Sequence, residues 1–149
     1  MDGEPVHVLL VEDNPDHADL VTFLLAKSQP KAKVVHHVSD GGAALDYLFR
    51  RGDFAIPDRS PRPHLILLDL RLPKVDGLAV LKEIKTSSDE ELRRTPVVVL
   101  TSSEADSDAA AAYDCKANSY LVKPVDFEKF HQLVEDLGYY WLVWNRPAA

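Results

Sequence analysis

Acidic residues in this chain directly follow short apolar runs at two points. Asp69 comes after "LILL" at residues 65–68, and Glu12 with Asp13 comes after "VHVLLV" at residues 6–11. Continuous apolar runs of this length are typical of parallel strands buried on both faces. The carboxyl ends of such strands form the edge of a sheet where ligands bind. Each acid is therefore a candidate functional group, although an acid at a strand end also serves simply as a loop cap.

A hydroxyl and an amine stand at the ends of two further apolar runs. Thr101 closes "PVVVLT" (96–101), and Lys123 follows "SYLV" (119–122). Taken alone, a Thr after a strand is usually a turn residue and a Lys before a proline is usually solvated. Four strand ends that carry acid, hydroxyl and amine together are much harder to attribute to separate structural roles.

This set of side chains suits phosphoryl chemistry. If the first and third strands are neighbours, Glu12, Asp13 and Asp69 converge and repel one another. Such repulsion raises a pKa or is relieved by a cation. Carboxylates favour Mg²⁺ or Ca²⁺, and a site with few carboxylates and open water positions suits Mg²⁺ beside a phosphate. A carboxylate nucleophile, a cation, a lysine and a hydroxyl donor can together accept and hold a phosphoryl group.

The hydrophobic pattern predicts the sheet that must bring these groups together. Five short segments rich in β-branched and aliphatic residues are expected as strands: 6–11, 33–38, 65–69, 96–101 and 119–122. Helical segments alternate with them, from Asn14-Pro15, over 43–49, from Gly77, over 107–114 and from Asp126. We therefore predict an α/β fold, a (βα)₅ doubly wound parallel sheet with strand order 2-1-3-4-5.

Length and composition limit the kinds of protein that this chain can be. Residues 1–149 make one domain, with a core at about 6–138, and the single Cys115 excludes an internal disulfide and a Cys-based zinc site. A net charge of −7 argues against nucleic acid as a partner. No apolar stretch reaches the length of a membrane span and no signal peptide precedes the first strand, so we expect a cytoplasmic protein without membrane contact.

Four motifs, in this order and spacing, resemble the receiver domains of two-component response regulators. They are "VLLVEDN", "LILLDLRLPKVDG", "PVVVLTSS" and "YLVKP", and the resemblance covers nearly the whole chain. It implies that Asp69 is the phosphoacceptor for a sensor histidine kinase. It also implies a Mg²⁺ ion held by Asp13, Asp69 and the backbone carbonyl of Arg71, with Glu12 acting mainly through a metal-bound water. Lys123 would pair with the phosphoryl group or its acceptor.

The resemblance assigns further roles around the acceptor. Thr101 and Tyr120 occupy the switch positions, where Thr101 moves toward the phosphoryl oxygen and the Tyr120 ring follows inward. Gly77 matches the glycine of the loop after the acceptor, and Pro124 would follow a cis peptide bond. The surface that changes would be formed by the helix at 107–114, the strand at 119–122 and the last helix.

Residue 71 separates this family from its main rival. Phosphohydrolases with an aspartate nucleophile carry a second acid two residues beyond it, and here that position is Arg71. A nucleotide-binding switch is excluded because no GxxxxGK[ST] loop is present. We therefore expect no enzyme beyond self-catalysed phosphotransfer and autodephosphorylation. In the family, the residues at the positions of Arg71 and Ser103 tune the lifetime of the phosphoryl group.

The C-terminal segment is unusually aromatic. It contains "GYYWLVWN" at 138–145, with 139–145 as a helical extension, and spacings of three and four residues put a set of apolar side chains on one face: Phe127, Phe130, Val134, Leu137, Trp141 and Trp144. One interpretation is that the two tryptophans cover the base of the sheet. We favour a homodimer, through the switch surface and the dimer-interface residues Phe130, Tyr140, Trp141 and Trp144.

The sequence defines the output of the protein and the identity of its phosphodonor less sharply than it defines the site. Only 25 residues follow Pro124, so we expect a stand-alone receiver without an output domain. The loop at 52–63, "LTSSEADSD", "VDF" and "YYWLV" resemble the single-domain regulators paired with bacterial and cyanobacterial phytochrome kinases. A phytochrome histidine kinase is therefore the expected phosphodonor. A phosphorelay intermediate that passes the group to a histidine phosphotransfer protein remains an alternative.

Overall fold

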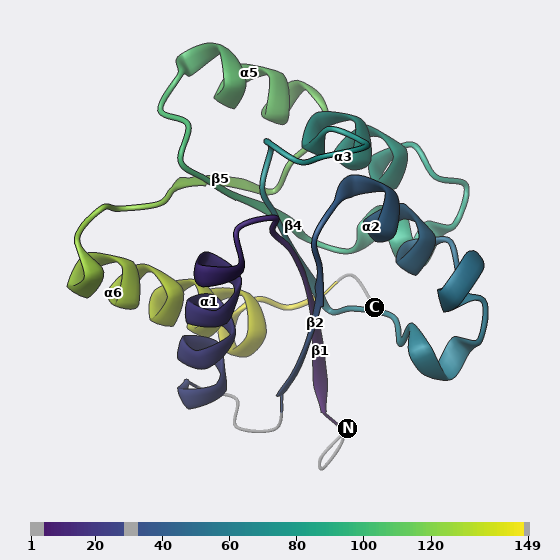
Figure 1. Ribbon diagram of the computed structural model, residues 1–149, viewed down its shortest axis with the longest axis horizontal. Coiled ribbons are helices and arrows are strands. Elements are labelled where there is room, and N and C mark those ends of the chain that lie inside the picture. The colour runs from purple at the N-terminus through teal and green to yellow at the C-terminus, as the bar shows by residue number, and fades with distance from the viewer. Residues whose placement is uncertain (1–4, 29–32, 148–149) are drawn as a thin grey trace.

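One parallel sheet of five strands organises the protein (Figure 1). The structure is a computed structural model that describes residues 5–28 and 33–147. The strands lie in the order β2-β1-β3-β4-β5. Their bounds are β1 Val6–Val11, β2 Lys33–Val38, β3 Leu65–Leu68, β4 Val97–Thr101 and β5 Ser119–Val122. The predicted fold class and strand order are confirmed, and the strand bounds agree with the expected ones within one residue.

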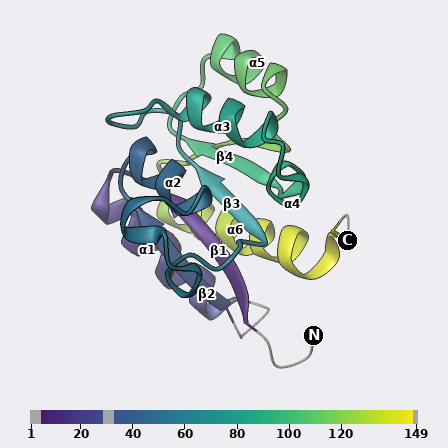
Figure 2. The same ribbon diagram turned by 90° about the vertical axis from the view of Figure 1, so that its right-hand side faces the viewer.

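Helices cover both faces of the sheet (Figure 2). One face carries α1 Pro15–Lys27 and α6 Phe127–Gly138. The other carries α2 Gly41–Leu48, α3 Gly77–Lys85, α4 Glu90–Arg94 and α5 Asp106–Asp114. The central strand β3 is fully buried from Leu65 to Leu68, as expected for a strand with helices on both sides. No helix in the described part of the chain is long and apolar enough to cross a membrane.

Side-chain caps fix the starts of α1 and α6, which follow the carboxyl ends of β1 and β5. The Asn14 side chain accepts hydrogen bonds from the backbone N–H groups of Asp16 (2.9 Å) and His17 (3.2 Å), and Pro15 occupies the first helical position. Asp126 caps α6 in the same way, accepting from the backbone of Glu128 at 2.8 Å. These caps satisfy amide groups that a helix start would otherwise leave unpaired, so each helix begins within a few residues of a strand end.

Gly77 ties α3 to the end of β3. A Cβ atom at this position would lie only 2.3 Å from the carbonyl oxygen of Asp69 and 2.6 Å from the Cα of Leu70. The Gly77 N–H donates to the carbonyl of Leu70 at 2.9 Å. Because no side chain fits this contact, glycine allows the helix to start directly against the backbone that presents Asp69.

Several short helices were not predicted from the sequence. The loop at 52–63 contains two 3₁₀ turns, η1 Gly52–Phe54 and η2 Pro57–Arg59. The helix α4 has only five residues and buries Leu92 alone, with Asp89 as its cap. One buried residue produces no helical periodicity, so a pattern of apolar residues cannot reveal such an element.

The end of α6 departs from the expected helical spacing. The segment η3 Tyr139–Trp144 is a π-helix, in which the N–H of Asn145 donates to the carbonyl of Tyr140 at 2.6 Å, five residues back. The wider turn shifts the phase of the side chains, so Trp141 packs against the core while Trp144 is 77% exposed. The interpretation that both tryptophans cover the base of the sheet therefore fits Trp141 but not Trp144, whereas the favoured dimer interpretation needs Trp144 to be exposed. Phe127, at the other end of the predicted apolar face, is also exposed.

Candidate functional site

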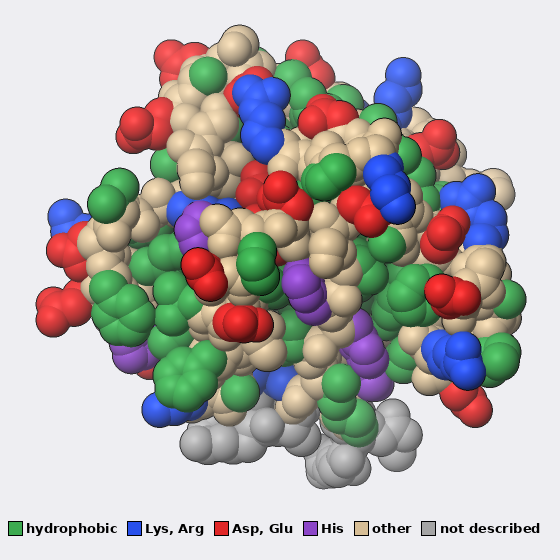
Figure 3. Space-filling model, viewed as in Figure 1, with side chains coloured by type: hydrophobic (Ala, Val, Ile, Leu, Met, Phe, Trp, Pro, Cys, Tyr) green, Lys and Arg blue, Asp and Glu red, His purple; other side chains and the backbone are tan. Residues whose placement is uncertain are grey.

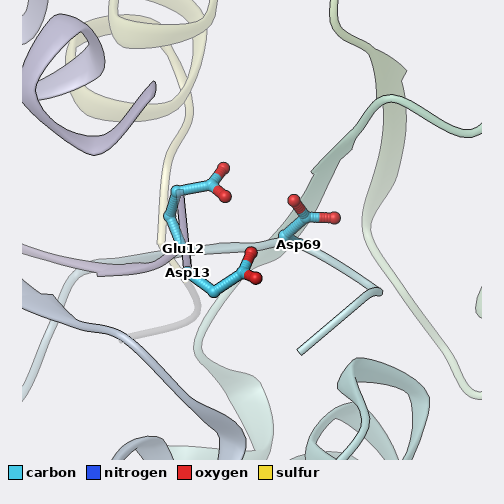
Figure 4. A group of neighbouring side chains, drawn as sticks. All are labelled: Glu12, Asp13 and Asp69. Atoms are coloured by element: carbon cyan, nitrogen blue, oxygen red, sulfur yellow. The ribbon is translucent and has the colours of Figure 1, made fainter. Parts of the chain in front are cut away.

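The two acidic stretches meet at the carboxyl edge of the sheet. The parallel register pairs Val11 with Leu68, so the residues that follow β1 and β3 emerge side by side. Glu12, Asp13 and Asp69 each offer a carboxylate oxygen, and these oxygens all lie within 4.8 Å of one another. Figure 4 shows the three side chains reaching into the same space. The sheet therefore brings together the three acids that the sequence singled out.

Lys123 enters this cluster from the end of β5. Its ammonium group donates to Glu12 Oε1 and, at 3.1 Å, to Asp69 Oδ2. The lysine side chain is only 4% exposed, and its backbone N–H donates to the carbonyl of Thr101 at 2.7 Å. A buried lysine needs such partners because an unpaired ammonium in the interior is costly. One cation thus bridges acids from two different strands.

The cluster retains an excess of negative charge. Burial raises the pKa of Glu12 above its usual value, and the hydrogen bond from Lys123 opposes that rise only in part. The neighbouring Asp69 charge also raises the pKa of Glu12. Asp13 is exposed, and no described residue forms an ion pair with its carboxylate. Three closely spaced oxygen donors with one lysine between them therefore fit a hard divalent cation.

An open cavity of about 450 Å³ lies over the acids. The predicted residues on its wall are Glu12, Asp13, Asp69, Arg71, Thr101, Ser103 and Lys123. The cavity is open to solvent, and Figure 3 shows that acidic side chains are spread over this face of the molecule. A phosphoryl donor can therefore reach the Asp69 carboxylate without displacing a structural element.

Thr101 and Tyr120 are connected through the loop that follows β4. The side chain of Thr101 is buried on the cavity wall, and its Oγ1 accepts from the backbone N–H of Ser103 at 3.4 Å. The Tyr120 hydroxyl donates to the carbonyl of Ser103 at 3.0 Å. A movement of the loop at Ser103 therefore affects both residues that were predicted as switch positions.

His17 is a site residue that sequence reasoning missed. It lines the cavity, with Nδ1 at 3.0 Å from the Lys123 ammonium. Burial lowers the pKa of His17, and the adjacent lysine charge lowers it further. A neutral imidazole can accept the third hydrogen bond of Lys123. The available signal was its place in the first turn of the helix that begins directly after Glu12 and Asp13.

Asp108 is a second residue that sequence reasoning missed. Its Oδ2 atom accepts from Arg71 Nη2 at 2.6 Å and from Ser103 Oγ at 2.5 Å. The backbone N–H of Arg71 also points to Asp69 Oδ1, at 3.4 Å. Ser103 is only five residues away, but Arg71 is 37 residues away in another loop, so no local pattern marks the pair Arg71–Asp108.

The predicted dimer residues do not form one exposed surface. Phe130 is 5% exposed and packs inside the core, so its assignment to a dimer interface needs correction. Trp141 is half-buried against the same core. Tyr140 and Trp144 are 56% and 77% exposed, and only these two of the four present large areas to solvent.

The fold and the site define a class of protein. Residues 8–135 match the response regulator receiver domain family, so the chain belongs to this family. The resemblance seen in the four strand-end motifs is thereby confirmed. The protein is a phosphorylatable receiver of two-component signalling.

Two relatives match this chain over nearly their whole lengths. The probable methanogenesis regulatory protein FilR2 of Methanothrix harundinacea is 46% identical over 148 residues, which cover 98% of this chain and 90% of the relative. Response regulator Rcp1 of Synechocystis sp. is 41% identical over 146 residues, which cover 97% of this chain and 95% of Rcp1.

Solved structures agree with this assignment. The Mn²⁺-bound form of Rcp1 matches with a TM-score of 0.88 at 39% identity, covering 97% of this chain and 100% of that chain. The phosphorylated cyanobacterial phytochrome response regulator RcpA also matches with a TM-score of 0.88 at 39% identity, covering 97% and 99%. The protein is thus close to the phytochrome response regulators within its family.

Proposed function

We propose that Asp69 accepts a phosphoryl group from a sensor histidine kinase and that the resulting change is read by a protein partner. The observation that carries this assignment is the meeting of Asp69 with Lys123 and two further acids in one open cavity. Asp69 is the acid at the end of the central, fully buried strand, so its carboxylate is held on a rigid support. Beyond this self-catalysed transfer and its own dephosphorylation, we propose no enzymatic activity.

Each side chain around Asp69 has a different role in the phosphoryl transfer. A carboxylate oxygen forms a bond to phosphorus while the bond from phosphorus to the kinase histidine nitrogen breaks, and that nitrogen takes up a proton. Lys123, already at 3.1 Å from Asp69 Oδ2, neutralises charge on the transferred group. The Thr101 hydroxyl on the cavity wall can donate to a phosphoryl oxygen. The expected cis peptide bond before Pro124 stays a prediction.

We propose Mg²⁺ as the cofactor of this transfer. Asp13 and Asp69 would bind the ion directly with the carbonyl of Arg71, and Glu12 would act through a water molecule. The close spacing of the three carboxylates supports this, as does the Mn²⁺-bound form of the relative Rcp1. When bound, the ion supplies positive charge that neutralises the equatorial oxygens of the phosphoryl group.

Labelling with a small radioactive acyl phosphate in the presence of Mg²⁺ tests the acceptor. Asp69→Asn should abolish labelling, since an amide cannot form the acyl phosphate. Asp76→Asn is a matched control, because Asp76 is an exposed acid in the same loop whose side chain makes no capping hydrogen bond. Labelling of Asp69→Asn at the rate of the control would falsify the assignment.

We propose a phytochrome histidine kinase as the phosphodonor, met in the cytoplasm. The support is the similarity to RcpA, which is described as a cyanobacterial phytochrome response regulator. Phosphotransfer profiling against purified sensor kinases tests this, with the fastest transfer expected from a phytochrome kinase. Preferential transfer from a kinase of another sensory class would contradict the proposal.

We also propose a homodimer that uses the surface of α5, β5 and α6 together with the exposed aromatic residues Tyr140 and Trp144. Val143, at 46% exposure, extends this apolar area. Trp144→Ala should lower the mass measured by light scattering, because aromatic side chains dominate interface energies. Phe23→Ala, which removes an exposed aromatic ring from α1, is the control and should leave the mass unchanged. A monomeric wild type would end the proposal.

A further inference from the structure

Asp108 connects two loops that border the acceptor cavity. It lies in the first turn of α5, a helix that packs beside α3 (Figure 1, Figure 2). A single oxygen, Oδ2, accepts from Arg71 of the β3–α3 loop and from Ser103 of the β4–α5 loop, at 2.6 Å and 2.5 Å. Both partners line the cavity above Asp69, whereas Asp108 itself does not. Asp108 can therefore act on the site only through these two residues.

The contact restrains a side chain that would otherwise be mobile. The Arg71 side chain is 68% exposed, while that of Asp108 is 16% exposed. A long arginine in solvent samples many rotamers, and its ordering costs entropy. The partly shielded carboxylate, fixed by Ser103 and by the start of α5, offers an anchored partner for a charge-assisted hydrogen bond. Because Arg71 and Ser103 share the same oxygen of Asp108, the guanidinium is held close to Ser103, which lines the cavity from the β4–α5 loop.

We propose that Asp108 is a positioning residue that holds Arg71 across the mouth of the cavity and so slows the attack of water on phosphorylated Asp69. This rests on the proposed function, in which Asp69 carries the phosphoryl group. Asp108 also fixes Ser103, whose carbonyl accepts the Tyr120 hydroxyl at 3.0 Å. The same carboxylate therefore joins the barrier over the acceptor to a predicted switch residue.

The reaction that this barrier slows is hydrolysis of the acyl phosphate. The oxygen of water forms a bond to phosphorus while the bond from phosphorus to the Asp69 carboxylate oxygen breaks. The products are the free carboxylate and dihydrogen phosphate, which keeps both protons of the water. The water must approach opposite the breaking bond, through the cavity that Arg71 and Ser103 help to line. Access past these two residues therefore affects the rate of loss without altering Lys123 or the acids.

The experiment follows loss of labelled phosphate from purified full-length protein after charging with an acyl phosphate. Asp108→Asn should lose the label about fivefold faster than wild type, the order of effect of weakening one charge-assisted hydrogen bond. Asp108→Glu, which keeps the charge, should restore most of the lifetime. Asp106→Asn is the matched control, because Asp106 is an exposed acid in the same turn of α5, and it should behave as wild type.

Two further measurements separate positioning from a merely structural role. Arg71→Ala should shorten the lifetime, and combining it with Asp108→Asn should add nothing, since both remove the same contact. Raising the salt concentration should accelerate loss from wild type but not from Asp108→Asn, because salt screens an exposed ion pair. Fully multiplicative effects, or the same salt dependence in both proteins, would overturn the inference.

The outcome also distinguishes this inference from the function on which it rests. If wild type takes up no label, the assignment of Asp69 as the acceptor fails. If all variants take up label but Asp108→Asn loses it at the wild-type rate or more slowly, only the role of Asp108 is refuted. Slower loss would mean that the freed Arg71 binds and protects the phosphoryl group instead.

Discussion

The carboxyl edge and the amino edge of the sheet differ in how far their charged side chains are neutralised by neighbouring groups. At the carboxyl edge, a cavity of about 450 Å³ holds clustered acids with a single lysine among them. At the amino edge, a cavity of about 510 Å³ contains apolar surface from Trp141, and its charges are paired. Arg62 contacts Asp89 at 2.6 Å, and Arg94 contacts Glu90 at 2.6 Å. Cavities of similar size therefore differ in whether their charges are neutralised by neighbours.

The difference shows how one sheet can hold a reactive group of acids at one edge and stabilising ion pairs at the other. Uncompensated acids at the carboxyl edge repel one another in the absence of a ligand, so binding of a cation there is favourable. At the amino edge, the charged side chains are already paired with one another, so they do not favour binding of a cation in this way. Because the strands are all parallel, every strand contributes its end to one edge and its start to the other, which keeps the two environments apart.

The largest effect should come from removing the divalent cation from the carboxyl edge. Chelation of Mg²⁺ should slow labelling by an acyl phosphate roughly 100-fold, since a metal contributes several kcal/mol to stabilising the transferred charge. Phosphorylation rates with and without chelator measure this, and chelator saturated with Mg²⁺ is the control. Labelling that continues unchanged would show that Lys123 alone neutralises the site.

A smaller effect should have opposite signs at the two edges. Without divalent cations, Asp13→Asn should raise the free energy of unfolding by up to about 1 kcal/mol, because it relieves repulsion with Glu12 and Asp69. Arg62→Gln should lower it by about 1 kcal/mol, because Arg62 pairs with Asp89 and donates to the carbonyl of Leu48. Urea denaturation measures both changes.

A charge change away from both edges provides the control for this comparison. Asp19→Asn alters an exposed acid on α1 and should change the free energy of unfolding by less than about 0.5 kcal/mol. Destabilisation by Asp13→Asn, or stabilisation by Arg62→Gln, would contradict the proposed difference between the edges.

The smallest effect should come from protonation of stacked histidines near the amino edge. The His7 ring lies against those of His36 and His64, at centroid distances of 5.2 and 6.1 Å. Burial lowers the pKa of His7 and of His36, and neighbouring histidines lower each further. Between the lowered pKa and 6.5 the unfolded chain binds more protons, so stability should fall as the pH drops below about 6.5.

Replacing one ring tests the histidine effect against a second, opposing one. The raised pKa of Glu12 favours the folded state at low pH, so total stability is not a clean measure of the histidines. The difference between wild type and His7→Gln, measured by urea denaturation at pH 7.5 and pH 5.5, isolates them. The variant should lose less stability on acidification, and an equal loss would rule out the stack as its source.

The strands of the sheet and the functional residues at its carboxyl edge could be predicted because each strand and the residue that follows it are contiguous in the sequence. A continuous apolar run such as residues 65–68 indicates a buried strand, and the residue that follows the run lies at the edge of the sheet. The place of His17 directly after Glu12 and Asp13 was visible in the sequence, but its contact with Lys123, 106 residues away, and the contact of Asp108 with Arg71 could not be predicted in this way. The pair Arg71–Asp108 joins residues 37 positions apart through the geometry of two loops. No local pattern encodes such a pairing.

The directions of the side chains in the aromatic tail could not be predicted for a different reason. Apolar spacing identifies a helical face only while the number of residues per turn stays constant, and the π-helix at Tyr139–Trp144 changes that number. Trp141 packs against the core, in agreement with the interpretation that we did not favour, while Trp144, three residues later, points outward, as the dimer interpretation requires. Composition thus indicated an aromatic segment, but the spacing of its residues did not determine which rings face the core and which face solvent.

The π-helix determines which side chains of the C-terminal tail face solvent. One residue more or less in this segment would turn everything beyond it by about 100° around the helix axis. A single insertion or deletion could therefore exchange the exposed Trp144 for another side chain without altering any atom of the acid cluster. Among related receivers, length variation at this one point offers a way for partner choice to diversify while the phosphorylation chemistry stays fixed.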